Sequence, residues 1–274
     1  NKFSITIVQM KKYWTVFKII LSNSFIYRLN FLLWRFRSVV VILTVYFLWD
    51  AVFKGNTVIA EYTRDKILTY VFLTSIITSI VFSNRSIDAA GEISDGRLSN
   101  YLLKPLNYHL YWFARDFADK FLNIIFSIGE IILLYFILRP PIFLQTDPMI
   151  IFQFFLAIIG AVFLNFLLGN FTSYFSFWTP GNAWGFWFLY LIFRDFLGGV
   201  MYPLDIFPKT TTQILNLLPF SYLLYFPANV YLGKISGGDF YAGFLIMIFW
   251  IFVTGFLITK LWKNGIKSYQ DEGR

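Results

Sequence analysis

The chain contains six apolar runs, each long enough to cross a lipid bilayer with some tilt or local thinning. The hydrocarbon core is about 30 Å thick, and an α-helix rises about 1.5 Å per residue. The strands of a β-barrel would instead alternate apolar and polar residues. We therefore predict an all-α polytopic membrane protein, a single domain over 1–274 with six transmembrane helices. The runs cover roughly 35–53, 67–83, 121–138, 149–175, 183–202 and 241–262.

The composition supports lipid as the main solvent and excludes several kinds of chemistry. Hydrophobic residues make up 58% of the chain and charged residues 14%, whereas about a quarter of a soluble domain is charged. There are no cysteines and one histidine, His109. Disulfides and thiolate sites are therefore excluded, and a histidine-based metal site is disfavoured.

The positive charge indicates orientation. If the N-terminus is inside, the cytoplasmic segments 1–37, 84–120 and 260–274 hold sixteen Lys and Arg residues, against six in the outer segments. Such an excess marks the cytoplasmic side. We expect both termini in the cytoplasm, in a bacterial-type inner (plasma) membrane. The net charge of +8 then needs no nucleic-acid partner.

The N-terminal segment 1–34 has the pattern of an amphipathic helix. Apolar residues recur at helical spacing, and polar residues occupy another face, as expected for a helix on a membrane surface. A short soluble helix packed on a neighbour is the alternative. The apolar positions are Met10, Trp14, Phe17, Leu21 and Phe25, and the polar ones are Lys11, Lys18 and Ser22.

The cytoplasmic stretch 84–120 carries five basic and five acidic residues and is predicted to be solvated. Part of it reads as a short amphipathic helix, suited to contact a cytoplasmic partner; an ordinary solvated loop is the alternative. Gly91 and Gly96 imitate a phosphate-binding loop, but the required Lys and Ser/Thr are missing. ATP would therefore bind another subunit. The helix face comprises Ile87, Ala90, Ser94, Leu98 and Leu102.

The outer stretch 203–239 is apolar and nearly uncharged, but prolines interrupt it. Irregular backbone at membrane depth persists only where protein shields it or it lines a water-filled cavity. The stretch is therefore predicted to form re-entrant or interfacial half-helices. The prolines are Pro203, Pro208, Pro219 and Pro227.

Three ionisable residues, Glu130, Arg194 and Asp195, lie within predicted spans and need partners or water. Counted from the cytoplasmic side, Glu130 and Arg194 differ in depth by about 3 Å, which predicts a Glu130–Arg194 ion pair. Asn165 and Asn170 in the fourth span are expected to hydrogen-bond between helices; lining a transport path is the alternative.

Two other functional classes remain open on these residues. An ion-coupled transporter or channel could use Glu130, Arg194 and Asp195 as ion sites. A membrane-embedded enzyme would need clustered catalytic groups, for which His109, Asp116 and Asp119 are the candidates. A solvated helix end is the favoured interpretation of those three.

Taken together, the segments resemble the type-2 ABC exporter permeases, the membrane-spanning subunits of ATP-binding-cassette transporters. One set of matching residues follows the second span: Glu92, Ile93, Gly96, Leu98 and Tyr101 to Pro105. A second set fills the C-terminal third: Phe177, Trp178, Gly198, Gly199, Tyr202 to Leu204, Phe207, Pro208, Leu218 to Phe220, Tyr225 to Pro227, Leu232, Gly233, Trp250, Leu261, Trp262 and Gly265. The stretch 54–66 carries no part of the likeness.

The resemblance implies a surface helix, six spans, a coupling helix after the second span and re-entrant helices before the sixth. It also implies a dimer of permeases, identical or related, over two ATP-binding subunits that hold ATP and Mg, with no catalytic site in this chain. Coupling to those subunits would rest on Ile87, Asp88, Glu92, Asp95, Gly96, Arg97, Leu98 and Lys104, aided by Lys11, Lys12 and Trp14. An outer gate would form around Pro203, Pro208, Pro219, Phe220 and Pro227.

Overall fold

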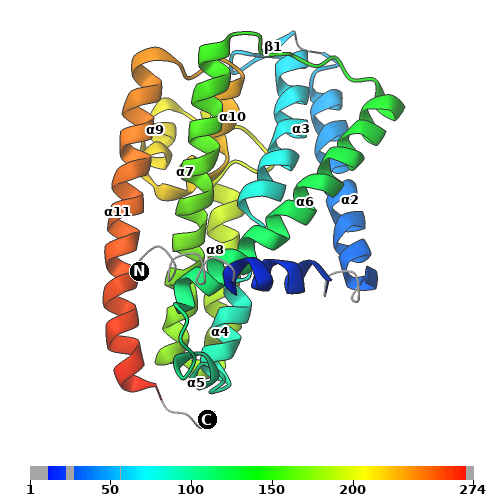
Figure 1. Cartoon of the computed structure of the whole chain (residues 1–274). Coiled ribbons are helices and arrows are strands. Elements are labelled where there is room, and N and C mark those ends of the chain that lie inside the picture. The colour runs from blue at the N-terminus through cyan, green and yellow to red at the C-terminus, as the bar shows by residue number, and fades with distance from the viewer. Residues whose placement is uncertain (1–11, 23–27, 56, 270–274) are drawn as a thin grey trace.

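The computed structural model describes residues 12–22, 28–55 and 57–269. Long helices run side by side as a bundle (Figure 1). They are α2 (Arg28–Val52), α3 (Arg64–Val81), α6 (Tyr108–Leu138), α7 (Pro148–Ser173) and α11 (Gly237–Ser268). Shorter elements are α4 (Ser86–Ser94), α5 (Ser99–Leu102), α8 (Ala183–Leu197), α9 (Lys209–Leu217), α10 (Tyr225–Tyr231) and the paired strands β1 (Val58–Ile59) and β2 (Tyr62–Thr63). Within these described ranges, 3-10 helices cover Tyr174–Phe177, Pro180–Asn182, Leu204–Ile206 and Pro219–Leu223.

Within the described residues, five helical segments are long and apolar enough to cross a membrane. A polytopic all-α membrane protein is thereby confirmed. The predicted run 183–202 differs, because α8 has only 15 residues and ends at Leu197. Gly199 follows with a φ of +81°, and a left-handed residue ends a right-handed helix. The five segments are Leu32–Val52, Arg64–Ser94, Tyr108–Leu138, Pro148–Phe177 and Gly237–Ser268.

The long helices present large apolar side chains outward. Phe252 on α11 is 73% exposed and Phe136 on α6 is 69% exposed. Such surfaces are unfavourable in water but match hydrocarbon, so the outer face of the bundle suits lipid. The interior contains several buried polar groups, which must then find partners inside the protein.

Helix α7 runs through the middle of the bundle in Figure 1 and packs closely against α11. Its small residues allow the approach, since Ala157 and Ala161 are fully buried. A Cβ on Gly160 would lie 2.3 Å from Met247 Cε of α11. Small residues at such contacts let helix backbones come close, which strengthens packing where lipid offers no hydrophobic drive.

The helix of residues 12–22, here called the surface helix, lies across the long helices in Figure 1. Its Phe17 and Ile20 pack against Ala118 of α6, while Trp14 is 55% exposed. A helix transverse to the bundle agrees with the predicted amphipathic element. Met10, Lys11 and Phe25 lie outside the described residues.

Candidate coupling site

The segment between α3 and α6 folds against α6 near one end of the bundle (Figure 1). The backbone N–H of Arg85, just before α4, donates to Asp116 Oδ1 at 2.9 Å. The Arg85 side chain donates to both oxygens of Asp119, with Nη2 2.9 Å from Oδ1, and Nη1 lies 3.4 Å from Asp88 Oδ2. One arginine thus joins the first turn of α4 to α6.

Lys120 of α6 caps the C-terminal end of α3. Its Nζ donates to the carbonyl of Val81 at 3.3 Å and to that of Ser83. The last carbonyls of a helix lack intrahelical partners and carry partial negative charge, so a cation stabilises them. Asp116 is 4% exposed and Lys120 is 5% exposed. The prediction that Asp116 lies at a solvated helix end is therefore wrong, because α6 begins at Tyr108 and packs this region against α3 and α4.

Glu92 is the centre of the hydrogen-bond network between α4, α5 and α6. It is 5% exposed and accepts from Tyr101 Oη at 3.0 Å, Tyr108 Oη at 3.1 Å and Arg115 Nη1 at 3.2 Å. Burial raises the pKa of the Tyr101 phenol, which therefore keeps its proton and donates. The Arg115 guanidinium also stacks 4.2 Å above the Trp112 ring.

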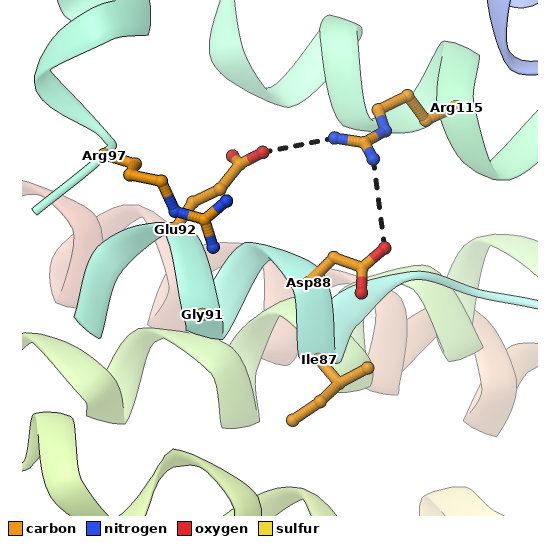
Figure 2. Close-up of a pocket in the computed structure, with 6 residues that line it drawn as sticks. All are labelled: Ile87, Asp88, Gly91, Glu92, Arg97 and Arg115. Carbon is orange, nitrogen blue, oxygen red and sulfur yellow. Dashed lines mark hydrogen bonds and ion pairs between the residues drawn. The ribbon is translucent and has the colours of Figure 1, made fainter. Parts of the chain in front are cut away.

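A pocket of about 320 Å³ opens beside this network, as Figure 2 shows. Its lining residues are Ile87, Asp88, Gly91, Glu92, Arg97 and Arg115. Arg115 bridges Glu92 at 3.2 Å and Asp88 at 3.8 Å, and Arg97 pairs with Asp95 at 2.7 Å. The Arg97 and Asp95 side chains are 59% and 57% exposed, and exposed pairs are weak. That pair therefore contributes little to the stability of the fold.

The structure brings most of the predicted coupling residues into this cluster, but not on a single helix. Gly96, with a φ of +74°, ends α4 and starts a turn into α5. Leu98 is fully buried, whereas Leu102, predicted on the same face, is 44% exposed. Lys104 Nζ lies 5.4 Å from the centre of the Tyr101 ring. The predicted continuous face therefore breaks at Gly96.

The surface helix contacts the end of the same segment. Lys12 Nζ lies 3.4 Å from the carbonyl of Pro105, and the backbone N–H of Asn107 donates to Tyr13 Oη at 3.1 Å. Trp14 stacks on Phe17 at 4.9 Å. Tyr13 carries one of the two hydrogen bonds, yet no spacing in the sequence singled it out. Lys11 lies outside the described residues.

The predicted Glu130–Arg194 pair is wrong. Glu130 of α6 pairs with Arg35 of α2 through two hydrogen bonds, one of them 2.6 Å long from Arg35 Nε. Arg35 Nη1 also lies 3.3 Å from Asn123 Oδ1. Arg194 instead pairs with its neighbour Asp195 at 2.7 Å and stacks 4.1 Å above the Phe82 ring. Arg35 stands at the predicted start of the first span, within the segment 1–37 assigned to the cytoplasm, so the sequence gives no reason to expect its partner at Glu130.

The two predicted asparagines differ in their contacts. Asn165 is fully buried; its Nδ2 donates to the Val81 carbonyl and its Oδ1 accepts from Tyr190 Oη, both at 2.6 Å. It therefore ties α7 to α3 and α8, as the expectation of hydrogen bonds between helices requires. Asn170 bonds within its own helix, to the carbonyl of Phe166 at 2.8 Å.

The prolines of the outer stretch begin short helical elements. Pro203 and Pro208 precede a 3-10 helix and α9, and Pro219 is the first residue of the 3-10 helix Pro219–Leu223. Pro227 lies in the first turn of α10. These are positions where the missing N–H of proline does no harm. Phe220 stacks with Phe193 of α8 at 6.1 Å.

A polar cluster that the sequence analysis missed fastens this stretch to the β1–β2 hairpin. Lys234 Nζ donates to Asp205 and to the carbonyl of Ala60 at 3.1 Å, and lies 3.6 Å from the centre of the Tyr62 ring. Tyr62 Oη also contacts Asp205 and Asn229. The hairpin lies in the stretch without any resemblance, so no motif pointed to it.

His109, Asp116 and Asp119 do not form a catalytic cluster. His109 Nδ1 lies 2.8 Å from Tyr174 Oη, and its ring packs against Trp262 at 4.9 Å. Both aspartates contact Arg85 instead. The three side chains therefore belong to two separate structural networks.

The long helices and the apolar outer face define a polytopic membrane protein. Its segment between α3 and α6 is polar and forms the short helices α4 and α5. The family model described as ABC-2 family transporter protein matches residues 39–273. The chain therefore belongs to this family, whose members are membrane subunits of ABC transporters and generally not catalytic. No curated protein matches the chain.

Proposed function

We propose that the chain is the permease subunit of an ABC exporter, which moves a substrate outward with energy from ATP hydrolysed on separate ATP-binding subunits. The observation that carries the proposal is the coupling segment, residues 85–105. It is fixed to the bundle by buried polar contacts, yet it presents an open pocket with charges of both signs. Such a surface suits a polar protein partner.

The proposed topology has six membrane crossings with both termini in the cytoplasm of a bacterial-type inner membrane. The fifth crossing would combine α8 with the segment after Gly199. The coupling segment and the surface helix would lie on the cytoplasmic side, where the excess of Lys and Arg is found.

We also place α9 and α10 as re-entrant helices. Trp250 Nε1 donates to the carbonyl of Leu217, at the end of α9, at 2.9 Å. Trp250 lies thirteen residues beyond the start of α11 at Gly237, which is about 20 Å along the helix. The chain returns through α10 to Tyr231, whose carbonyl accepts from Gln145, just before α7, at 2.9 Å. A chain that enters the membrane from the outer side as α9 and returns to that side through α10 is suited to form an outer gate.

Two permeases, identical or related, would form the membrane unit, and two ATP-binding subunits would dock on the coupling segments. ATP and Mg would reside on those subunits, and this chain would hold no cofactor. An ion-coupled transporter is less well supported, because Glu130 and Arg194 are engaged in ion pairs with Arg35 and Asp195.

The test is a pull-down of the chain from its native membrane in mild detergent, followed by mass spectrometry and an ATPase assay. A P-loop ATPase should co-purify with the wild-type chain, and at least five-fold less with Arg97→Glu. Lys209→Glu makes the same charge change on exposed α9 and should have no effect. A chain that purifies alone, without ATPase activity, would overturn the proposal.

A further inference from the structure

The turn between α4 and α5 is held by a residue from the far end of the chain. Tyr269 Oη donates to the carbonyl of Gly96 and accepts from the backbone N–H of Ser99, 3.1 Å away. Ser99 N–H is in the first turn of α5 and has no carbonyl partner within that helix, and the Gly96 carbonyl, which follows the end of α4, also accepts from Ser99 Oγ at 3.0 Å. A single phenol thus satisfies a donor and an acceptor on opposite sides of the turn.

Tyr269 is fixed to the bundle through aromatic packing at the end of α11. Its ring meets Phe177 edge-on at 6.1 Å. Phe177 in turn lies so close to α11 that a Cβ on Gly265 would be 2.2 Å from its Cδ2. Trp262, one turn before Gly265 on α11, stacks on Tyr108 of α6 at 5.1 Å. The end of α11 and the turn therefore have little freedom to move separately.

The N-terminal half of α11 contacts the proposed outer gate. A Cβ on Gly243 would lie 2.4 Å from the Phe226 ring of α10, and Trp250 bonds to the end of α9. The helix has 32 residues, about 48 Å. One continuous helix thus connects the coupling segment with both gate helices, and Figure 1 shows its length beside α9.

We infer that Tyr269 is a positioning residue that passes movement of the coupling turn to α11, and through α11 to α9 and α10. The inference rests on the proposed function and adds a transmission route to it. Displacement of Gly96 and Ser99 by a docked partner must move the Tyr269 hydroxyl or break its two hydrogen bonds. The first outcome shifts α11, and small sliding movements of packed helices are a common form of such a shift.

The experiment uses the chain with its co-purified ATPase, reconstituted in nanodiscs. Hydrogen exchange of residues 86–102 and 209–231 is compared with and without ATP plus vanadate. Tyr269→Phe removes only the hydroxyl, and Tyr241→Phe makes the same change at an exposed position on α11. In the wild type and in Tyr241→Phe, ATP should change exchange in both segments. In Tyr269→Phe the ATPase should still co-purify, while the change in 209–231 falls at least two-fold.

A rescue variant separates transmission from loss of structure. The chain has no native cysteine, so Ser99→Cys with Tyr269→Cys can be joined by a bismaleimide, which should restore the response of 209–231. An undiminished response in Tyr269→Phe, or no restoration by the cross-link, would overturn the inference alone. Absence of any ATPase from the wild-type complex would remove the proposed function, and the inference with it.

Discussion

Removing one partner of the Arg35–Glu130 pair should destabilise the protein far more than removing both. The side chains are 9% and 14% exposed, and Arg35 is held by two hydrogen bonds to Glu130 and one to Asn123. Arg35→Met or Glu130→Leu leaves the other charge with no opposite charge at a site that faces lipid or protein. A stranded buried charge costs about 3–5 kcal/mol, and insertion scales give about 2.5–3.5 kcal/mol for a charge at membrane depth.

The double variant Arg35→Met/Glu130→Leu removes both charges and keeps an apolar contact of similar volume. Replacement of a buried pair by apolar residues is often neutral, so its free energy of unfolding should lie within about 1 kcal/mol of the wild type. The coupling energy in a double-mutant cycle then exceeds about 3 kcal/mol. Reversible unfolding in mixed micelles, followed by tryptophan fluorescence, provides the measurement.

The same cycle discriminates between the two candidate partners of Glu130. Residues without a shared contact are additive within about 0.5 kcal/mol, so Glu130→Leu with Arg194→Met should show no coupling. Additive effects for Arg35 and Glu130 would refute the reasoning, and strong coupling between Glu130 and Arg194 would restore the pair that the sequence predicted.

Three other substitutions have outcomes that the packing determines, each measured by unfolding in the same micelles. Gly199→Ala should cost about 2 kcal/mol or more, since Ala in a left-handed conformation loses about 1–2 kcal/mol and its Cβ would lie 2.9 Å from Tyr70 Oη. The control Gly185→Ala, in an open helical position, should be neutral or slightly stabilising. Equal effects of the two substitutions on the free energy of unfolding would contradict the structure. Asn165→Leu removes the hydrogen bonds that Asn165 makes to the Tyr190 hydroxyl and the Val81 carbonyl and should cost about 2–4 kcal/mol. The control Thr172→Val loses a hydrogen bond within its own helix and should cost less than about 1 kcal/mol. Lys120→Met leaves the Val81 and Ser83 carbonyls at the end of α3 without the cation that caps them, so a loss of about 1.5–3 kcal/mol is expected. An unchanged stability would show that α3 needs no cation at its end.

The membrane class and the long helices could be predicted because continuous hydrophobicity is a one-dimensional signal. A run such as 149–175 needs no knowledge of its neighbours to be identified as a span, and α7 follows it to within a few residues. The prolines of the outer stretch acted in the same local way, since each marks the start or first turn of a short element. The local sequence was therefore sufficient to predict the long helices and the starts of the short ones.

Partners across the bundle could not be predicted in this way. Tyr269 and Gly96 are 173 positions apart, and no periodicity connects a tyrosine after one helix to a glycine after another. Lys234 and Tyr62 likewise meet only because the outer stretch folds back over the hairpin. Such contacts depend on how helices rotate and slide against each other, which is a property of the packed bundle.

The failed Glu130–Arg194 prediction shows how a depth count goes wrong. The count placed the start of each apolar run at the same membrane surface. In the structure, α8 begins beside α4, since Trp187 Nε1 donates to Ser86 Oγ at 3.2 Å, so Arg194 reaches only the level of Phe82.

Lys120 of α6 contacts the carbonyls on either side of Phe82, which places Lys120 and Arg194 at one level. Glu130 lies ten residues farther along α6, about 15 Å away and beyond the reach of the Arg194 side chain. A carboxylate at that depth requires a cation from a helix that begins higher in the bundle, and Arg35, in the second turn of α2 after Arg28, meets the requirement.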